Sequence, residues 1–367
     1  MGRRKQFSGI GTRPSRLAMA AIMIVLAALA EASLRILELG YGHTPINPDA
    51  DLGFAHPKDF HYRIYSRHGE YGGYAVHYGS DGARVMNRFS EAAPRPDTTS
   101  CRIAFLGDSF TEALQVRFEK SYVGRIGQAS GCAFRNYGVG SYSPIHYLIQ
   151  WGSIAQSFQP TLVVLQLFAD DEASDTTLME QAVKSADGLP LRIGSAERWP
   201  LLWLREIYLV RLFRMTYNRV LWTVADQRAA LADERPSHGL APDETDNPEV
   251  SDVTSRLVSA LAERVNKSGA RLILLAIPAE RTLREARSSV PFAKKWRAWA
   301  TQRDIQFIDV ASALAAILKS GKTPFYAANG HFNEMGHAVI ADALCRGLAS
   351  EADLSLDCLK ANSAAQF

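Results

Sequence analysis

The spacing of apolar residues changes along this chain near residue 100. From Cys101 onward, continuous apolar runs alternate with longer segments of helical period. Continuous rather than alternating runs are typical of strands covered on both faces. Strands that alternate with helices predict an α/β fold with a three-layer, doubly wound parallel sheet. The predicted strands are Ile103–Leu106, Ala133–Val139, Leu162–Phe168, Leu272–Ile277 and Phe307–Val310.

The same pattern divides the chain into segments. The main domain is predicted at 101–350, with a tail at 351–367, and one of its helices starts at Val253 and stops near Gly269. Residues 41–100 contain many Gly, Tyr, His and Pro residues. They predict an extended arm that packs on the domain, with a short strand around Tyr74–Tyr78 and a turn at "GSDG".

Residues 178–250 predict an insertion into the main domain. It consists of a basic, aromatic helix, "RWPLLWLREIYLVRLFRMTYNRVLW", followed by a polar loop. Such a helix can lie on an anionic membrane surface, or it can be a cap helix whose aromatic residues pack on the sheet. The sequence leaves both interpretations open.

The first 40 residues predict a membrane segment. Five basic residues precede an apolar run at Leu17–Ala30: Arg3, Arg4, Lys5, Arg13 and Arg16. The run predicts an uncleaved signal anchor, or a signal peptide cleaved near Ala28-Leu29-Ala30. A soluble amphipathic helix is the third interpretation. In the first two cases the basic end stays in the cytoplasm. The protein then sits in a bacterial inner membrane with its main domain in the periplasm or outside, or is secreted after cleavage.

Charge and cysteine content narrow the range of partners. A formal net charge of +3 is too small to indicate a nucleic-acid partner. The four cysteines form no CxxC pair, which argues against a zinc ribbon or a thioredoxin-like motif.

In an oxidising compartment we expect the disulfides Cys101–Cys132 and Cys345–Cys358. Four unpaired buried thiols are the alternative.

Polar residues follow several of the predicted strands. Ser109 ends "LGDS" after the first strand, and a Gly-rich stretch, "RNYGVGSYSP", follows the second. Asp170 and Asp171 end the third strand, and His331 lies in a late loop before a helix. Ligands of doubly wound sheets bind at the carboxyl ends of the strands. A serine nucleophile there requires a base, and exposed backbone N–H groups can hold an oxyanion.

Two of these blocks carry a family resemblance. "FLGDSFTEA" after an apolar strand and "GHFNEMGHAVIADAL" before a helix resemble the SGNH (GDSL-type) hydrolase superfamily, and closely its bacterial membrane-anchored branch. The resemblance covers about residues 100–180 and 255–350, and "YGSDGARV" in the arm is also similar to that branch. It implies a flavodoxin-like sheet and a site without metal or cofactor. Ser109 is then the nucleophile and one oxyanion donor, and His331 is the general base.

The remaining site residues follow the family pattern less closely. The resemblance puts a second oxyanion donor on Gly140 or Ser141. The third donor is normally an Asn, but Asp170 stands here. An ionised carboxylate only accepts hydrogen bonds, so Asp170 could donate only when protonated. The family's Asp before the histidine is also missing, and we expect Asn329 to orient the imidazole through its side-chain carbonyl.

Other interpretations of these residues stay open. Ser109 could be a helix N-cap, which is a common position for serine. His331 could be structural, or could form a metal pair with His337, although no third ligand is evident. Asp170 could make local hydrogen bonds at the strand end. Glu112 is interpreted as an acidic residue in the first turn of a helix.

The resemblance implies a serine esterase that acts on a small acyl ester. The substrate class expected from the family and the location is an O-acetylated envelope or secreted saccharide. The departures from the family pattern at Asp170 and Asn329 leave a second interpretation open. In it the protein is a catalytically impaired relative that binds a glycan or a protein in an envelope assembly. A saccharide O-acyltransferase is a further alternative.

Overall fold

The main domain is built on one large mixed sheet. The computed structural model describes residues 15–37, 45–66, 69–87, 101–193, 204, 207–231, 249–285 and 290–349. Within them, eight strands form a sheet in the order β12-β11-β8-β6-β7-β5-β4-β3. The first five are parallel and belong to the predicted domain: β6 (Arg102–Leu106), β7 (Ala133–Asn136), β8 (Leu162–Phe168), β11 (Arg271–Ile277) and β12 (Gln306–Asp309).

The parallel part has the flavodoxin-like strand order. In chain order its strands run 2-1-3-4-5, since β6 lies between β7 and β8. The chain therefore continues from β6 to β7 on one side and then crosses over to β8 on the other side of β6. This reversal creates a topological switch point at the end of β6. All five predicted strands are present, although β7 ends at Asn136 instead of Val139. The predicted α/β class and doubly wound sheet are confirmed.

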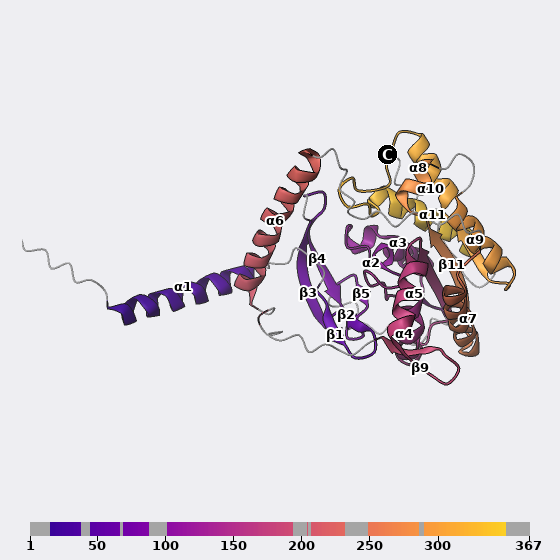
Figure 1. Ribbon diagram of the computed structural model, residues 1–367, viewed down its shortest axis with the longest axis horizontal. Coiled ribbons are helices and arrows are strands. Elements are labelled where there is room, and N and C mark those ends of the chain that lie inside the picture. Colours follow the sequence, from indigo (N-terminus) through magenta and orange to yellow (C-terminus); the bar gives the residue numbers. More distant parts are fainter. Residues whose placement is uncertain are drawn as a thin grey trace, which may run out of the picture.

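Helices cover both faces of this sheet (Figure 1). On one face α3 (Tyr122–Ser130) packs against α11 (Glu334–Ala349). On the other, α4 (Pro144–Ser157) and α5 (Asp171–Gln181) pack on α7 (Asp252–Lys267), which follows the predicted helix. The helices α9 (Pro291–Thr301), α8 (Glu280–Glu285) and α10 (Ala311–Lys319) complete the C-terminal half.

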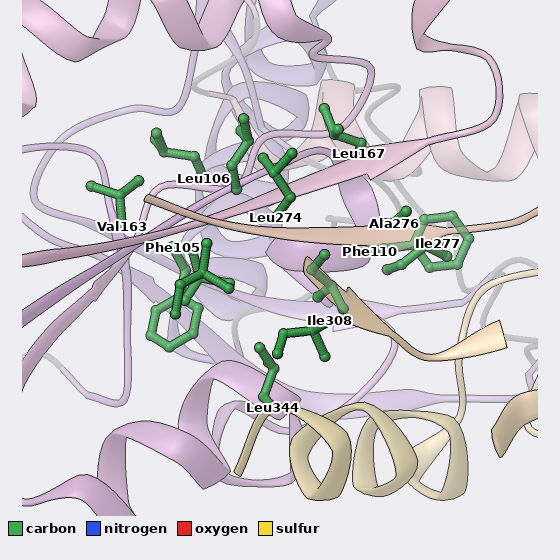
Figure 2. Packing of buried hydrophobic residues seen from close by; sticks show 14 of the residues in the cluster. Phe105, Leu106, Phe110, Val163, Leu167, Leu274, Ala276, Ile277, Ile308 and Leu344 are labelled. Carbon is green, nitrogen blue, oxygen red and sulfur yellow. The ribbon is translucent and has the colours of Figure 1, made fainter. Parts of the chain in front are cut away.

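Apolar side chains fill the space between the layers. Figure 2 shows part of this core, where side chains from four parallel strands meet one from α11. Continuous burial of both strand faces explains the continuous apolar runs in the sequence. The labelled residues are Phe105, Leu106, Phe110, Val163, Leu167, Leu274, Ala276, Ile277, Ile308 and Leu344.

The arm extends the sheet instead of only packing on it. Its strands β3 (Phe60–Tyr65), β4 (Gly72–Tyr78) and β5 (Arg84–Val85) are antiparallel, and β5 pairs with β7. The strand predicted around Tyr74–Tyr78 is thus part of the central sheet, which is mixed and not purely parallel. The alternation of Tyr62 and Ile64 on β3 with Tyr74, Val76 and Tyr78 on β4 builds a second, smaller core. A short hairpin, β1 (Asn47–Asp49) and β2 (Gly53–Ala55), precedes it.

The insertion contains a hairpin as well as a helix. Strands β9 (Ala182–Lys184) and β10 (Pro190–Ile193) pair antiparallel, which the sequence pattern did not predict. Helix α6 (Tyr208–Leu231) covers the second half of the predicted helical stretch. The first part of that stretch and the polar loop lie largely outside the described residues.

The N-terminal apolar run is a helix that projects from the molecule. The most apolar 18-residue window of helix α1 (Arg16–Ile36) has a mean hydropathy of 2.2, and none of that window is buried. Length and composition therefore allow it to cross a membrane, and a signal sequence passes the same test. Residues 1–14, with most of the basic cluster, lie outside the described part.

One expected disulfide is present in full. Cys101 and Cys132 are bonded, with Cα atoms 5.1 Å apart, at the adjacent starts of β6 and β7. Cys345 on α11 is also disulfide-bonded. Its expected partner, Cys358, lies outside the described residues.

Candidate active site

Ser109 begins the short helix α2 (Ser109–Glu112) directly after β6. Gly107 makes the tight connection, because a Cβ there would lie 1.9 Å from Oγ1 of Thr111 and 2.4 Å from Oε1 of Gln166. Asp108 is the N-cap, and its carboxylate accepts the N–H of Phe110 at 2.8 Å. Sheet and helix together therefore hold the serine at the switch point.

His331 comes from a tight loop before α11. The N–H of Tyr326 donates to the carbonyl of His331 at 2.8 Å, and the N–H of Gly330 returns to the carbonyl of Tyr326 at 2.9 Å. Gly330 has φ +71°, which favours glycine at this position. Asn333 then caps α11 by accepting the N–H groups of Met335 and Gly336. Local turn chemistry thus fixes the direction of the imidazole.

The two side chains meet across the sheet edge. Nε2 of His331 lies 2.7 Å from Oγ of Ser109, and Nδ1 lies 3.1 Å from the main-chain oxygen of Asn329. A carbonyl oxygen can only accept, so the network assigns the proton to Nδ1 and leaves Nε2 to accept the serine proton. The ring of Phe110 stacks on the imidazole with centroids 5.0 Å apart. This is the tautomer that a general base needs.

Asn329 orients the histidine differently from the sequence expectation. We expected its side-chain carbonyl to hold Nδ1, but the main-chain carbonyl does so. The side-chain oxygen Oδ1 is buried with no hydrogen-bond partner among the described residues. Because the contact comes from the main chain, any residue with the same backbone conformation could supply it. The identity of residue 329 in the sequence therefore does not predict this contact.

The surroundings of His331 favour its neutral form. Burial lowers the pKa of His331 below its usual value, while the hydrogen bond to Asn329 and the charge of Glu112 oppose that shift. A neutral imidazole at physiological pH can accept a proton. The protonation state and the tautomer therefore both suit a base.

Gly140 and Ser141 lie in a turn beside the serine. The N–H of Tyr142 closes the turn on the carbonyl of Val139, and Ser141 adopts φ +68°. Positive φ is uncommon for a residue other than glycine, and such strain often occurs at functional sites. A Cβ on Gly140 would lie 3.7 Å from the Cβ of Ser109, so the turn is next to Ser109.

The N–H of Gly140 already donates a hydrogen bond inside the protein, to Oε2 of Glu112 at 2.9 Å. The oxyanion donor role expected for Gly140 is therefore not available in this arrangement. The N–H of Ser109, at the first position of α2, is not consumed by a helical hydrogen bond.

Glu112 is a buried acid, which the sequence did not suggest. Its side chain is only 2% exposed, and Oε1 lies 3.0 Å from Nε2 of His56 and 3.0 Å from the hydroxyl of Tyr78. His56 and Tyr78 both belong to the arm, and their rings stack with centroids 4.2 Å apart. The residue does lie in α2, as predicted, but it links the nucleophile helix to the arm.

A buried arginine of the arm fixes the turn after α2. Arg84, 1% exposed, donates to the carbonyls of Glu112 at 2.7 Å, Ala113 at 2.5 Å and Val116 at 2.9 Å. Ala113 has φ +58° and needs such support. The available signal was the place of Arg84 between Ala83 and Val85 in "YGSDGARV", and a charged side chain is almost never fully buried unless it is paired.

The arm also contacts the histidine loop. The carboxylate of Glu70 accepts the N–H of Ala328 at 3.0 Å, and Tyr71 packs on Tyr326 with ring centroids 5.4 Å apart. The arm therefore contacts the segments that carry both Ser109 and His331. The composition of residues 41–100 predicts only packing on the domain, and it does not indicate this connection to the site.

Carboxylates collect at the ends of β6 and β8. Asp170 precedes α5 and makes no side-chain cap, and burial raises its pKa. Burial likewise raises the pKa of Asp108 to about 7 and that of Asp171 above its usual value. Asp171 accepts the N–H of Phe168 at 2.9 Å, so it caps the strand end. No hydrogen bond joins Asp170 to Ser109.

His337 has a packing role. Its Nδ1 accepts the N–H of Tyr122 at 3.4 Å, and its ring stacks with that of Tyr122. Burial lowers its pKa to about 3, so it stays neutral. Within the described ranges, no group of three or more His, Cys, Asp or Glu side chains is placed to hold a metal.

Comparison with known proteins finds similar solved structures. No protein-family model and no curated protein matches the chain. Similar solved structures include a putative lipolytic protein of the G-D-S-L family from Desulfitobacterium hafniense, at 12% identity and TM-score 0.40, covering 68% of this chain and 100% of that one. A catalytic mutant of an acetylxylan esterase from Geobacillus stearothermophilus matches at 14% identity and TM-score 0.39, covering 68% and 94%.

One of these similar structures is named as a G-D-S-L lipolytic protein and the other as an acetylxylan esterase. About a third of this chain has no counterpart in them, since each covers 68% of it.

Proposed function

We propose that the protein is a serine esterase of the SGNH type, with Ser109 as nucleophile and His331 as general base. The observation that carries this proposal is the 2.7 Å contact between Oγ of Ser109 and Nε2 of His331, in the tautomer that accepts a proton. A helix N-cap serine has no need of such a partner. The position of the pair at the switch point of the sheet agrees with where such folds bind ligands.

The pair can perform acyl transfer in two halves. In the first, Ser109 Oγ attacks the ester carbonyl carbon while its proton passes to Nε2 of His331. The imidazolium then gives that proton to the leaving alkoxide, which departs as an alcohol and leaves an acyl-serine. In the second, His331 takes a proton from water, the hydroxide attacks the acyl carbon, and Ser109 regains its proton as the acid leaves.

The imidazolium is held without a carboxylate on Nδ1. The main-chain oxygen of Asn329 supplies a dipole there, and the charge of Glu112 favours the protonated ring. The backbone N–H of Ser109 can donate to the oxyanion. Ser141 and a protonated Asp170 are the further donors we propose, while Gly140 could join only after releasing Glu112.

A non-catalytic relative is the second candidate, and one observation favours it. A carboxylate on the N–H of Gly140 puts negative charge where an oxyanion would form. A protein that only binds an acylated saccharide or an envelope partner would tolerate this. An O-acyltransferase would use the same pair but pass the acyl group to a saccharide hydroxyl instead of water.

The expected location of the protein limits the class of substrate that we propose. An apolar N-terminal helix and a disulfide between Cys101 and Cys132 suit an exported domain in an oxidising compartment. The small acyl esters available there include O-acetylated saccharides of the envelope or of secreted polymers. The acetyl group is therefore the first acyl group to test.

A serine-directed fluorophosphonate probe tests the proposal directly. Labelling should occur at Ser109 and disappear in both Ser109→Ala and His331→Gln, while circular dichroism shows an intact fold. Hydrolysis of a nitrophenyl acetate should fail in the same two variants. A folded wild-type protein that resists the probe and shows no turnover would favour the binding candidate. Acetyl transfer to an added saccharide, without free acetate, would identify a transferase.

A further inference from the structure

Exposed apolar side chains are concentrated on two helices. Among the large apolar residues that the structure describes as exposed, all but Met86, Val183 and Leu191 belong to α6 or to α1 and its C-cap Leu37. Single exposed apolar residues are ordinary, but a contiguous group marks an interaction surface. The function proposed above uses neither helix.

The group on α6 forms one face. Phe213, Tyr217 and Leu221 follow one another at four-residue spacing, and Val210 and Val220 fall on the same side. Phe213 is 73% exposed and Tyr217 is 55% exposed, and their rings stack on each other. We call these five residues the α6 apolar face.

The opposite side of α6 packs on the domain. Tyr208 packs against the small core on β3 and β4, and Arg211 is buried with its guanidinium 4.6 Å from the Tyr208 ring. The α6 apolar face is therefore turned away from the sheet. Within the described residues, α6 therefore packs on the arm strands through Tyr208 on one side and has no partner on the other, so the two expectations for this helix do not exclude each other.

Helix α1 is joined to α6 where the apolar run of α1 ends. The carboxylate of Glu31 accepts the N–H groups of Tyr208 at 3.0 Å and Leu209 at 2.9 Å, and so caps α6. Arg35 pairs with Glu31 and lies over the Tyr208 ring at 5.1 Å. The contact is confined to the last turns of α1, because the residues before Glu31 are exposed.

The contact between the last turns of α1 and the first turn of α6 sets the depth of α6 relative to a bilayer. A helix of 21 residues is about 30 Å long, close to the thickness of the hydrocarbon core. When α1 spans a bilayer, its C-terminal end lies at the outer boundary of the hydrocarbon, and Glu31 and Arg35, in its last two turns, bring the first turn of α6 close to that level. Figure 1 shows α1 projecting to one side of α6, with β3 and β4 on the other.

We propose that α6 lies on the outer surface of the membrane that α1 crosses, with its apolar face inserted at the boundary between headgroups and acyl chains. The occupant of this face is an anionic lipid surface. Exposed Arg214 borders the face, and the helix sequence carries basic residues and no acidic residue between Tyr208 and Ala225. Basic amphipathic helices with aromatic residues bind such surfaces. The helix then fixes the orientation of the catalytic edge above the bilayer.

The test uses the full chain in proteoliposomes of phosphatidylethanolamine and phosphatidylglycerol. A fluorophore is attached to Phe213→Cys, and its matched control to Leu191→Cys on β10, which is 54% exposed and apolar. We expect shallow spin-labelled lipids to quench the label at position 213, and aqueous iodide to reach only the label at position 191. Arg214→Gln should lower the docked-to-undocked ratio about fivefold.

Two outcomes would overturn the proposal. Iodide could quench position 213 as well as position 191, which would mean that the face stays in water. Position 213 could instead be shielded from both iodide and lipid quenchers, which would mean that a second copy or another protein covers it. The variant Phe213→Glu/Tyr217→Glu, with the label at Val220→Cys, should restore access to iodide. Its melting temperature, compared with that of Leu191→Glu, separates lost docking from lost folding. None of these readouts depends on the chemistry of Ser109.

Discussion

Glu112 accepts the N–H of Gly140 at 2.9 Å, and this contact joins the nucleophile helix to the turn expected to form part of the oxyanion hole. The other oxygen of the same carboxylate meets His56 and Tyr78 from the arm. The acid therefore has a structural function and an electrostatic one. Its substitution should affect both, in ways that can be measured separately.

Removing Glu112 should destabilise the fold. Glu112→Ala leaves the buried His56 and the part-buried N–H of Gly140 without their partner, and leaving a buried polar group unsatisfied costs about 1–3 kcal/mol. Glu112→Gln should cost less, because its amide oxygen still accepts a hydrogen bond. Urea unfolding measures the difference. Equal stability of wild type and Glu112→Ala would show that the network contributes nothing to the fold.

The same charge should also appear in the pH profile. Burial lowers the pKa of His331, so the base stays neutral, and kcat/KM should stay high, to a pH below the ordinary 6.5 of histidine. Because Glu112 opposes this shift, Glu112→Gln should move the acid limb further down. The exposed Glu119, in the short 3₁₀ helix Phe118–Lys120 that follows α2, gives a matched control, Glu119→Gln, whose profile should match wild type. An acid limb that moves upward in Glu112→Gln would contradict this electrostatic assignment.

Local patterns in the sequence predicted the site residues whose positions are set by their neighbours along the chain. The run Ile103–Leu106 and the residues after it predicted a strand end with Ser109, and the block before α11 predicted His331. The link between Glu112 and His56 could not be found in this way, because 56 positions separate them (112 minus 56) and only the pairing of the arm strands brings them together. The oxygen that holds Nδ1 belongs to the main chain of Asn329, which has no side-chain signature.

The disulfide should contribute measurably to stability. It closes a loop across a sequence separation of 31, for which the loss of chain entropy in the unfolded state predicts about 3–4 kcal/mol. Cys101→Ser/Cys132→Ser should therefore unfold at lower urea concentration while the nitrophenyl ester activity of the folded protein persists. The oxidised wild type, measured with and without reductant, is the control. A stability unchanged by removal of the bond would contradict the estimate.

Asp108 should make stability fall as pH rises. Burial raises its pKa to about 7 in the folded protein, against 3.8 for the free group. The folded state therefore binds the proton more tightly, so this contribution is fully present below about pH 4 and is lost as pH rises toward 7. Asp108→Asn still accepts the N–H of Phe110 and should flatten that part of the curve. Unfolding free energies from pH 4 to 8 test this, and Glu119→Gln should leave the slope unchanged.

Asp170 stands where the resemblance to SGNH hydrolases leads us to expect an asparagine that donates to the oxyanion. Burial raises its pKa, yet its ionised form still only accepts hydrogen bonds and repels the oxyanion. Asp170→Asn supplies an N–H donor at every pH, and one such donor can contribute about 10²–10³ in kcat. We expect kcat/KM for the nitrophenyl ester to rise in this variant at pH 8, and the gain to shrink as pH falls and protonated Asp170 becomes a donor itself. Asp171→Asn, on a neighbouring carboxylate that caps Phe168, should give no such gain. A loss of activity in Asp170→Asn at all pH values would show that Asp170 acts through its charge, and it would remove this residue from the proposed oxyanion hole.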